Sequence, residues 1–228
     1  MTRRRFPVGK TLLYVFMSLW ALTTIYPFIW VILNSFKPRG LIRSDTFSLP
    51  IGDKFTLENY VTAFKRVDIG TAYVNSIVIS GAVTVVVMVL AGLAAYAMVR
   101  YSFRLRGFLH SMIIASMMFP VFSTIIPVFR MESSWGIVNT GSIWLTRLSV
   151  VLPQIAGNLS FAIIVLMGFI RSLPVDLEEA AYLEGYNVYQ IFFRIIMPLA
   201  KPSFATVGIF TFLWSYNDLF LQMFFLRS

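Results

Sequence analysis

The sequence predicts an all-α integral membrane protein with about five transmembrane helices. Of the 228 residues, 58% are hydrophobic and only 13% are charged, whereas roughly a quarter of the residues in an ordinary soluble domain are charged. A soluble chain of this size has too small a core to bury that much apolar surface, but a lipid bilayer can solvate it. We therefore expect a single membrane domain over residues 1–228.

Five apolar runs are each long enough to cross the hydrocarbon layer as a helix, which takes about 20 residues. A helix also satisfies its own backbone hydrogen bonds, as a lipid environment requires. The runs contain no Lys, Arg or Glu; His110 lies in the third run and Asp218 in the fifth. The predicted spans are Thr11–Phe36, Ile69–Val99, Gly107–Phe129, Leu148–Ile170 and Pro202–Leu226.

Basic residues between the runs set the predicted orientation, because cytoplasmic loops carry an excess of Lys and Arg. The N-terminus holds Arg3–Arg5 and Lys10 with no acid, and the charged residues of Arg100–Arg106 are likewise all basic. Both segments, and so the N-terminus, are expected in the cytoplasm. Connectivity then makes residues 37–68 an external loop and residues 171–201 an internal loop. This distribution accounts for the net charge of +9 without a nucleic-acid partner.

Composition disfavours several functional classes. The chain has no cysteine, which excludes disulfides, cysteine-based metal sites and thiol chemistry. His110 is a lone histidine without acidic companions, so we expect no metal site there. A membrane enzyme would need a cluster of nucleophile, base or metal ligands, and a secondary transporter would need buried coupling charges, for which only Asp218 is available. We therefore expect no enzymatic activity and no cofactor, with a secondary transporter as the weaker alternative.

The internal loop, residues 171–201, contains the signals for a short helix. Pro174 should end the preceding helix. Asp176, followed three residues later by Glu179, matches a capping box and predicts a helix start, and acids in a first turn suit the helix dipole. Gly185 is placed to end this helix as a left-handed C-cap.

A second helix start follows at once, because Asn187 and Gln190 repeat the capping-box spacing. This helix should run to about Ile196, before Pro198 and Pro202 stop it. The first helix has only about two turns, too few to be stable alone in water, so it should dock against something. An alternative is a loop that lies idle against the lipid headgroups.

The loop resembles the cytoplasmic "EAA" loop of ABC-importer permeases. Its pattern is Glu179-Ala180-Ala181, three residues, Gly185, nine residues, Ile195, one residue, then a hydrophobic residue and Pro198. Glu184 stands where that family usually has Asp, and Met197 where it usually has Leu. Further segments resemble the second permease subunit of maltose-type carbohydrate importers: "NSFKP" (34–38), "LENY" (57–60), "AAYAMVRYSFRLRG" (94–107), "FPVFSTIIPVF" (119–129) and "WSYNDLF" (214–220).

The resemblance implies a set of partners and a mechanism. Two permease subunits would form the pathway for a sugar, a pair of cytoplasmic ATPases would bind and hydrolyse ATP, and an external binding protein would deliver the substrate. The internal loop would dock as a coupling helix in the ATPase. A permease for a non-sugar solute is the alternative within this class. Such permeases usually have one more span, so we expect the gene to encode a sixth helix after Ser228. The implied coupling residues are Glu179, Ala180, Ala181, Gly185, Ile195 and Pro198.

Polar residues at membrane depth are the candidates for the substrate path. Asp218 is the only acid within a predicted span, and such residues are functional candidates by default, although near an interface a carboxylate can simply reach water. The amides at membrane depth should face a pore or form interhelical hydrogen bonds. Aromatic residues near Asp218 could stack on a sugar or belong to an interfacial belt. The candidates are Gln154, Asn158, Asn217 and Asp218, with Trp214 and Tyr216 as possible stacking residues.

Overall fold

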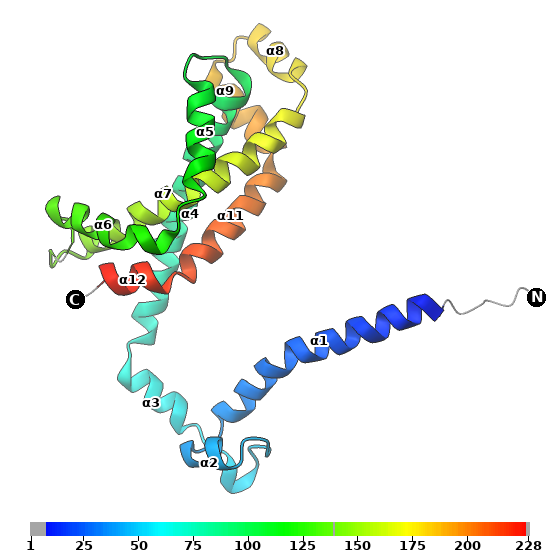
Figure 1. Ribbon diagram of the computed structural model, residues 1–228, viewed down its shortest axis with the longest axis vertical. Coiled ribbons are helices and arrows are strands. Elements are labelled where there is room, and N and C mark those ends of the chain that lie inside the picture. Colours follow the sequence, from blue (N-terminus) through cyan, green and yellow to red (C-terminus); the bar gives the residue numbers. More distant parts are fainter. Residues whose placement is uncertain (1–7, 139, 227–228) are drawn as a thin grey trace, which may run out of the picture. The chain divides into compact units, whose positions relative to one another are not determined.

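The computed structural model describes residues 8–138 and 140–226, and in this part of the chain helices are joined by turns and short loops without any strand (Figure 1). The helices are α1 (Val8–Ser35), α2 (Arg39–Ser44), α3 (Glu58–Arg66), α4 (Ile69–Arg100), α5 (Arg106–Ser116), α6 (Val121–Ser134), α7 (Ile143–Ser172), α8 (Asp176–Leu183), α9 (Val188–Ile191), α10 (Met197–Leu199), α11 (Lys201–Tyr216) and α12 (Leu219–Phe225). A 3-10 turn occupies Gly52–Lys54, and a π-helical turn, Phe192–Ile196, joins α9 to α10.

The chain forms two compact units, which meet between Ala72 and Tyr73. In the first unit, the segment after α1 is organised around a completely buried lysine, Lys37. Its ammonium group donates hydrogen bonds to the carbonyl oxygens of Asp45 (3.1 Å) and Thr46 (2.8 Å). The Asn59 side chain in turn donates to the Lys37 carbonyl oxygen at 2.7 Å. A buried ammonium needs such acceptors, so the "NSFKP" segment fixes the shape of the loop between α1 and α4.

The second unit is a helical bundle built around α4, α7 and α11 (Figure 1). The long helix α7 packs against α5, α6, α11 and α12. Gly92 of α4 lies close to Phe204 of α11 and to Phe192 of the π-helical turn. A Cβ at Gly92 would lie only 2.8 Å from the Phe204 ring and 2.9 Å from the Phe192 ring. Glycine therefore lets the aromatic rings reach the α4 backbone, and the core of the bundle lies along this line of contact.

The all-α membrane fold is confirmed, but two of the five predicted spans are broken. Within the described part of the chain, three helices, α1, α4 and α7, are long and apolar enough to cross a membrane. A fourth candidate is the pair Val188–Leu199 and Lys201–Tyr216, which bends by 82°.

The predicted third span, Gly107–Phe129, is two helices instead of one. Helix α5 ends at Ser116, and α6 begins after Pro120, whose backbone is extended. Proline has no amide hydrogen for a helix and disfavours helical geometry in the residue before it, so it separates the helices here. The predicted fifth span is also divided, because α11 ends at Tyr216 and α12 starts only at Leu219.

Candidate functional site

The internal loop forms the predicted pair of short helices, but the first helix starts differently from the prediction. Helix α8 begins at Asp176 with Val175 as its N-cap, and no side chain caps this end. The predicted capping box of Asp176 and Glu179 is therefore wrong. Val175 already has helical dihedral angles, so Asp176 lies inside the first turn and cannot act as the cap. The acids of the first turn still suit the positive end of the helix dipole.

The turn at Gly185 has the predicted left-handed conformation, with φ of +87°. The Gly185 amide donates to the Tyr182 carbonyl oxygen at 3.0 Å, and the Tyr186 amide donates to the Ala181 carbonyl oxygen at 3.0 Å. These two bonds form a Schellman motif, which ends a helix and satisfies its last carbonyl groups. Glycine is favoured there because a residue with a Cβ pays roughly 1 kcal/mol or more for this conformation.

The second helix starts as predicted and continues further than predicted. The Asn187 side chain accepts from the Gln190 amide (2.9 Å), and the Gln190 side chain accepts from the Asn187 amide (2.8 Å), which completes the capping box. The helix does not stop at Ile196 but continues through the π-helical turn into α10. A proline ring clashes with the carbonyl four residues earlier. For Pro198 that carbonyl lies in the wider π-helical turn, which accommodates the proline.

A buried ion pair attaches α8 to the bundle. The Glu178 side chain is 5% exposed and forms a salt bridge with Arg100, whose side chain is 11% exposed. The other carboxylate oxygen of Glu178 accepts from the Tyr96 hydroxyl group at 2.8 Å. Arg100 also donates to the Leu173 carbonyl oxygen at 2.9 Å. We call these four residues the α8 clamp; it joins α8, the end of α4 and the residue that follows α7.

A second contact joins α8 to the segment that follows α4. The hydroxyl groups of Tyr101, just after α4, and Tyr182, on α8, lie 2.7 Å apart and share a hydrogen bond. Burial, and then the bond to Tyr182, raise the pKa of the Tyr101 hydroxyl group above its usual value, so it stays protonated and available for this bond. The segment of Arg100–Arg106 and the internal loop therefore lie at the same end of the bundle, where Figure 1 shows α8.

The predicted coupling residues divide between the surface and the interior of this chain. Glu179, Ala180, Gly185 and Pro198 are exposed, and Ile195 is half-buried. Ala181 is buried within the chain, so its small side chain serves packing inside the bundle. Sequence reasoning missed Leu183, which is 91% exposed at the end of α8.

Three of the four predicted substrate-path residues lie together on a cavity of about 310 Å³. Gln154 and Asn158 of α7 line it, as does Asp218 between α11 and α12. Gln154 accepts from the Ser215 hydroxyl group and donates to Asp218 at 3.5 Å. Asn217 does not line this cavity; it is exposed, and its side chain donates to the Leu213 carbonyl oxygen of its own helix.

Asp218 has a structural role in the helix break as well. Its carboxylate accepts from the Leu221 amide at 3.0 Å and so caps the N-terminus of α12. The prediction placed Asp218 within one continuous span, which is wrong because α11 ends before it. Trp214 and Phe161 also line the cavity, and their rings contact each other with centroids 4.8 Å apart. Tyr216, the other aromatic candidate, is not among the lining residues.

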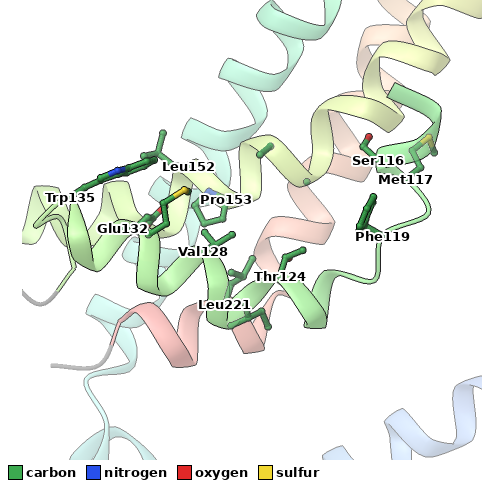
Figure 2. A pocket seen from close by; sticks show the side chains of 14 residues that line it. Ser116, Met117, Phe119, Thr124, Val128, Glu132, Trp135, Leu152, Pro153 and Leu221 are labelled. Atoms are coloured by element: carbon green, nitrogen blue, oxygen red, sulfur yellow. The ribbon is translucent and has the colours of Figure 1, made fainter. Parts of the chain in front are cut away.

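A neighbouring cavity of about 460 Å³ contains a buried acid that sequence reasoning missed (Figure 2). Glu132, on α6, is 1% exposed, and its Oε2 atom has no hydrogen-bond partner among the described residues. Figure 2 shows Glu132 near Trp135, beside Leu152 and Pro153 of α7. Glu132 lies just beyond the third apolar run, where a single acid gave no reason to expect burial.

The fold and the loop can now be compared with known proteins. The family described as "Binding-protein-dependent transport system inner membrane component" matches residues 87–228. This range includes the α8 clamp, the helix–turn–helix of the internal loop and both cavities. The chain belongs to this family. It is therefore a multi-pass membrane permease, as the apolar helices indicate.

Individual relatives agree with this membership. The permease is 35% identical over 210 residues to the diacetylchitobiose uptake system permease protein of Streptomyces coelicolor, covering 92% of this chain and 67% of the relative. It is 33% identical over 199 residues to the trehalose transport system permease protein of Mycobacterium tuberculosis, covering 87% and 69%. In fold it is similar to a chain of a bacterial ABC transporter involved in the import of the acidic polysaccharide alginate, with a TM-score of 0.82, 24% identity and coverage of 100% and 78%.

The α8 clamp leads to a prediction about the stability of this end of the permease. Glu178→Gln removes the negative charge and leaves Arg100 buried without a counter-ion, which should destabilise α8 by about 2–4 kcal/mol. Hydrogen–deuterium exchange of the purified importer should then show faster exchange for the amides of Asp176–Leu183. Glu184→Gln is the matched control, because that side chain is exposed and is not among the predicted coupling residues. Equal exchange in the two variants would contradict the clamp.

Proposed function

We propose that this permease forms part of the membrane pathway of an ATP-driven importer for a sugar. The observation that carries the proposal is the α8 clamp, which fixes a short helix with an exposed end rigidly to the bundle. A helix of this length would not be stable in isolation, and its exposed Leu183 is available to a partner. Family membership supports the importer, and the diacetylchitobiose and trehalose relatives support a sugar as its substrate.

The coupling step would be rigid-body transmission. We infer that α8 docks on a cytoplasmic ATPase subunit, with Glu179, Ala180 and Leu183 on the side away from the bundle. When ATP draws the ATPase subunits together, α8 would move with them. The salt bridge of Glu178 with Arg100 would pass that displacement to the end of α4, and the Arg100 bond to Leu173 would pass it to the end of α7. Packed elements with two positions transmit motion in this way.

The sugar would pass the cavity that Gln154, Asn158 and Asp218 line. Amide and carboxylate groups can form hydrogen bonds with hydroxyl groups, and the ring of Trp214 offers an apolar face for a sugar ring. The break between α11 and α12 lies beside this cavity. A membrane protein tolerates non-helical backbone where that backbone lines a cavity, so the break is consistent with a pathway here. Asn217 is left out of this pathway because its side chain bonds within its own helix.

The proposed assembly contains several partners. A second permease subunit would complete the pathway, a pair of ABC ATPases would bind ATP, and an external solute-binding protein would deliver the sugar. The proposed location is the bacterial cytoplasmic membrane, with the N-terminus and α8 on the cytoplasmic side and residues 37–68 outside. The Arg100–Arg106 segment and the internal loop lie at the same end of the bundle. This supports the arrangement, because the sequence predicts that both segments are cytoplasmic.

The turn of the internal loop provides the test of coupling. Gly185→Val should leave the permease in the membrane but abolish sugar uptake, because valine disfavours the φ of +87° and misplaces the end of α8. Glu179→Ala should reduce uptake less, since α8 keeps its clamp and its turn. Uptake and co-purified ATPase are the measurements. Normal uptake by Gly185→Val with the ATPase still bound would contradict the coupling proposal, and an idle loop predicts that result for both variants.

Topology can be tested by labelling, because the chain has no native cysteine. Leu183→Cys places a single thiol on the exposed end of α8, and Phe47→Cys places one on the proposed external loop, where Phe47 is 81% exposed. In intact cells, a membrane-impermeant maleimide should modify the Phe47 variant only. Both should react in opened membranes from cells that produce the permease without its ATPase, so that the proposed docking surface of α8 is uncovered. Modification of the Leu183 variant from outside would show that the orientation is reversed.

A further inference from the structure

The two cavities at the end of the bundle away from α8 are neighbours with a common wall. The cavity of Gln154 and Asp218 and the cavity of Glu132 share four lining residues: Met117, Pro153, Gly157 and Leu221. The wall between them includes the glycine and proline of α7, which present little side chain. A ligand that occupies one cavity therefore lies beside the other.

The titratable residues that line these cavities, among the described residues, are all acidic. Each is lined by one acid, Glu132 in the larger and Asp218 in the smaller, and the described residues that line them include no Lys, Arg or His. This contrasts with the net charge of +9 of the whole chain. Because the walls are otherwise mostly apolar and aromatic, the field of each carboxylate is weakly screened inside the cavities.

Glu132 is the observation that points to a ligand. Its side chain is 1% exposed, and Oε2 has no donor among the described residues. A buried acceptor without a partner is costly, so a permease that keeps one gains if a ligand supplies the donor. Sugar hydroxyl groups are donors of the right kind. Trp135 in the same cavity can cover the apolar face of a sugar ring.

We propose that the joined cavities select carbohydrates without negative charge, whose hydroxyl groups donate to Glu132 and Asp218, and that they exclude sugars bearing a carboxylate or sulfonate. The proposal rests on the proposed function, since it assigns the substrate class of the same pathway. An acidic sugar would bring a third negative charge into a poorly screened space with no basic residue to pair with it. Like charges brought together at a binding site are strongly unfavourable.

The test compares a neutral disaccharide with its acid. The assembled importer, in lipid nanodiscs at pH 8 to favour ionised carboxyl groups, is titrated with cellobiose, trehalose or melibiose, and with cellobiouronic acid. Binding is followed by tryptophan fluorescence, because Trp135 and Trp214 line the two cavities. We expect at least one neutral sugar to bind about tenfold or more tightly than the acid. In the double variant Glu132→Gln/Asp218→Asn, the difference in affinity between the neutral and the acidic sugar should fall to about threefold or less.

Controls separate the possible failures. Glu184→Gln removes an exposed acid of the internal loop and should leave the tenfold difference intact. Trp135→Phe and Trp214→Phe should abolish most of the fluorescence change, which assigns it to the cavities. Equal binding of cellobiouronic acid and the neutral sugars would overturn charge selection. A fluorescence change that survives both Trp variants, or no change with any sugar, would overturn the cavity assignment. Importer function itself is tested separately, by sugar uptake in the unchanged permease compared with the Gly185→Val variant.

Discussion

The buried salt bridge between Glu178 and Arg100 is the interaction on which the arrangement of the internal loop depends. Helix α8 is too short to be stable by itself, and its burial is confined to Glu178 and Ala181. Removing two charges from water is costly unless further hydrogen bonds satisfy them, and here Tyr96 and the Leu173 carbonyl group complete the site. The result is a helix whose inner face is fixed to α4 while its outer face remains available to a partner.

Breaks in the helices shape the other end of the bundle. In a lipid environment, backbone groups outside a helix need partners within the protein. Pro120 separates α5 from α6, and Asp218 caps α12 after α11 ends. These breaks bring short helices beside α7 and form the two cavities, in which Gln154 and Glu132 are buried. The same constraint that forces most of the chain into long helices therefore places its few polar side chains around the proposed pathway.

Features with local causes were predictable from the sequence, and contacts between distant segments were not. The positive φ of Gly185 and the capping box of Asn187 follow from neighbouring residues, and both were predicted. The partner of Glu178 lies far away in the sequence, and nothing near either residue indicates the pairing. The break at Pro120 had a signal in the proline itself, whereas the prediction of one span rested on the length of the apolar run alone. The prediction of Asp176 as the N-cap was wrong because Val175 already has helical dihedral angles, so the helical turn begins one residue earlier.

The central claim is that α8 moves as one body with α4. Spin labels at Leu177→Cys on α8 and Val85→Cys on α4, both at exposed positions, would report the distance between these helices in the assembled importer. Pulsed electron paramagnetic resonance should give one narrow distance distribution that is the same without nucleotide and with ATP bound. Adding Glu178→Gln should broaden it. A distance that shifts between the two nucleotide states in the otherwise unchanged, transport-active importer would show that α8 is hinged and would contradict the claim.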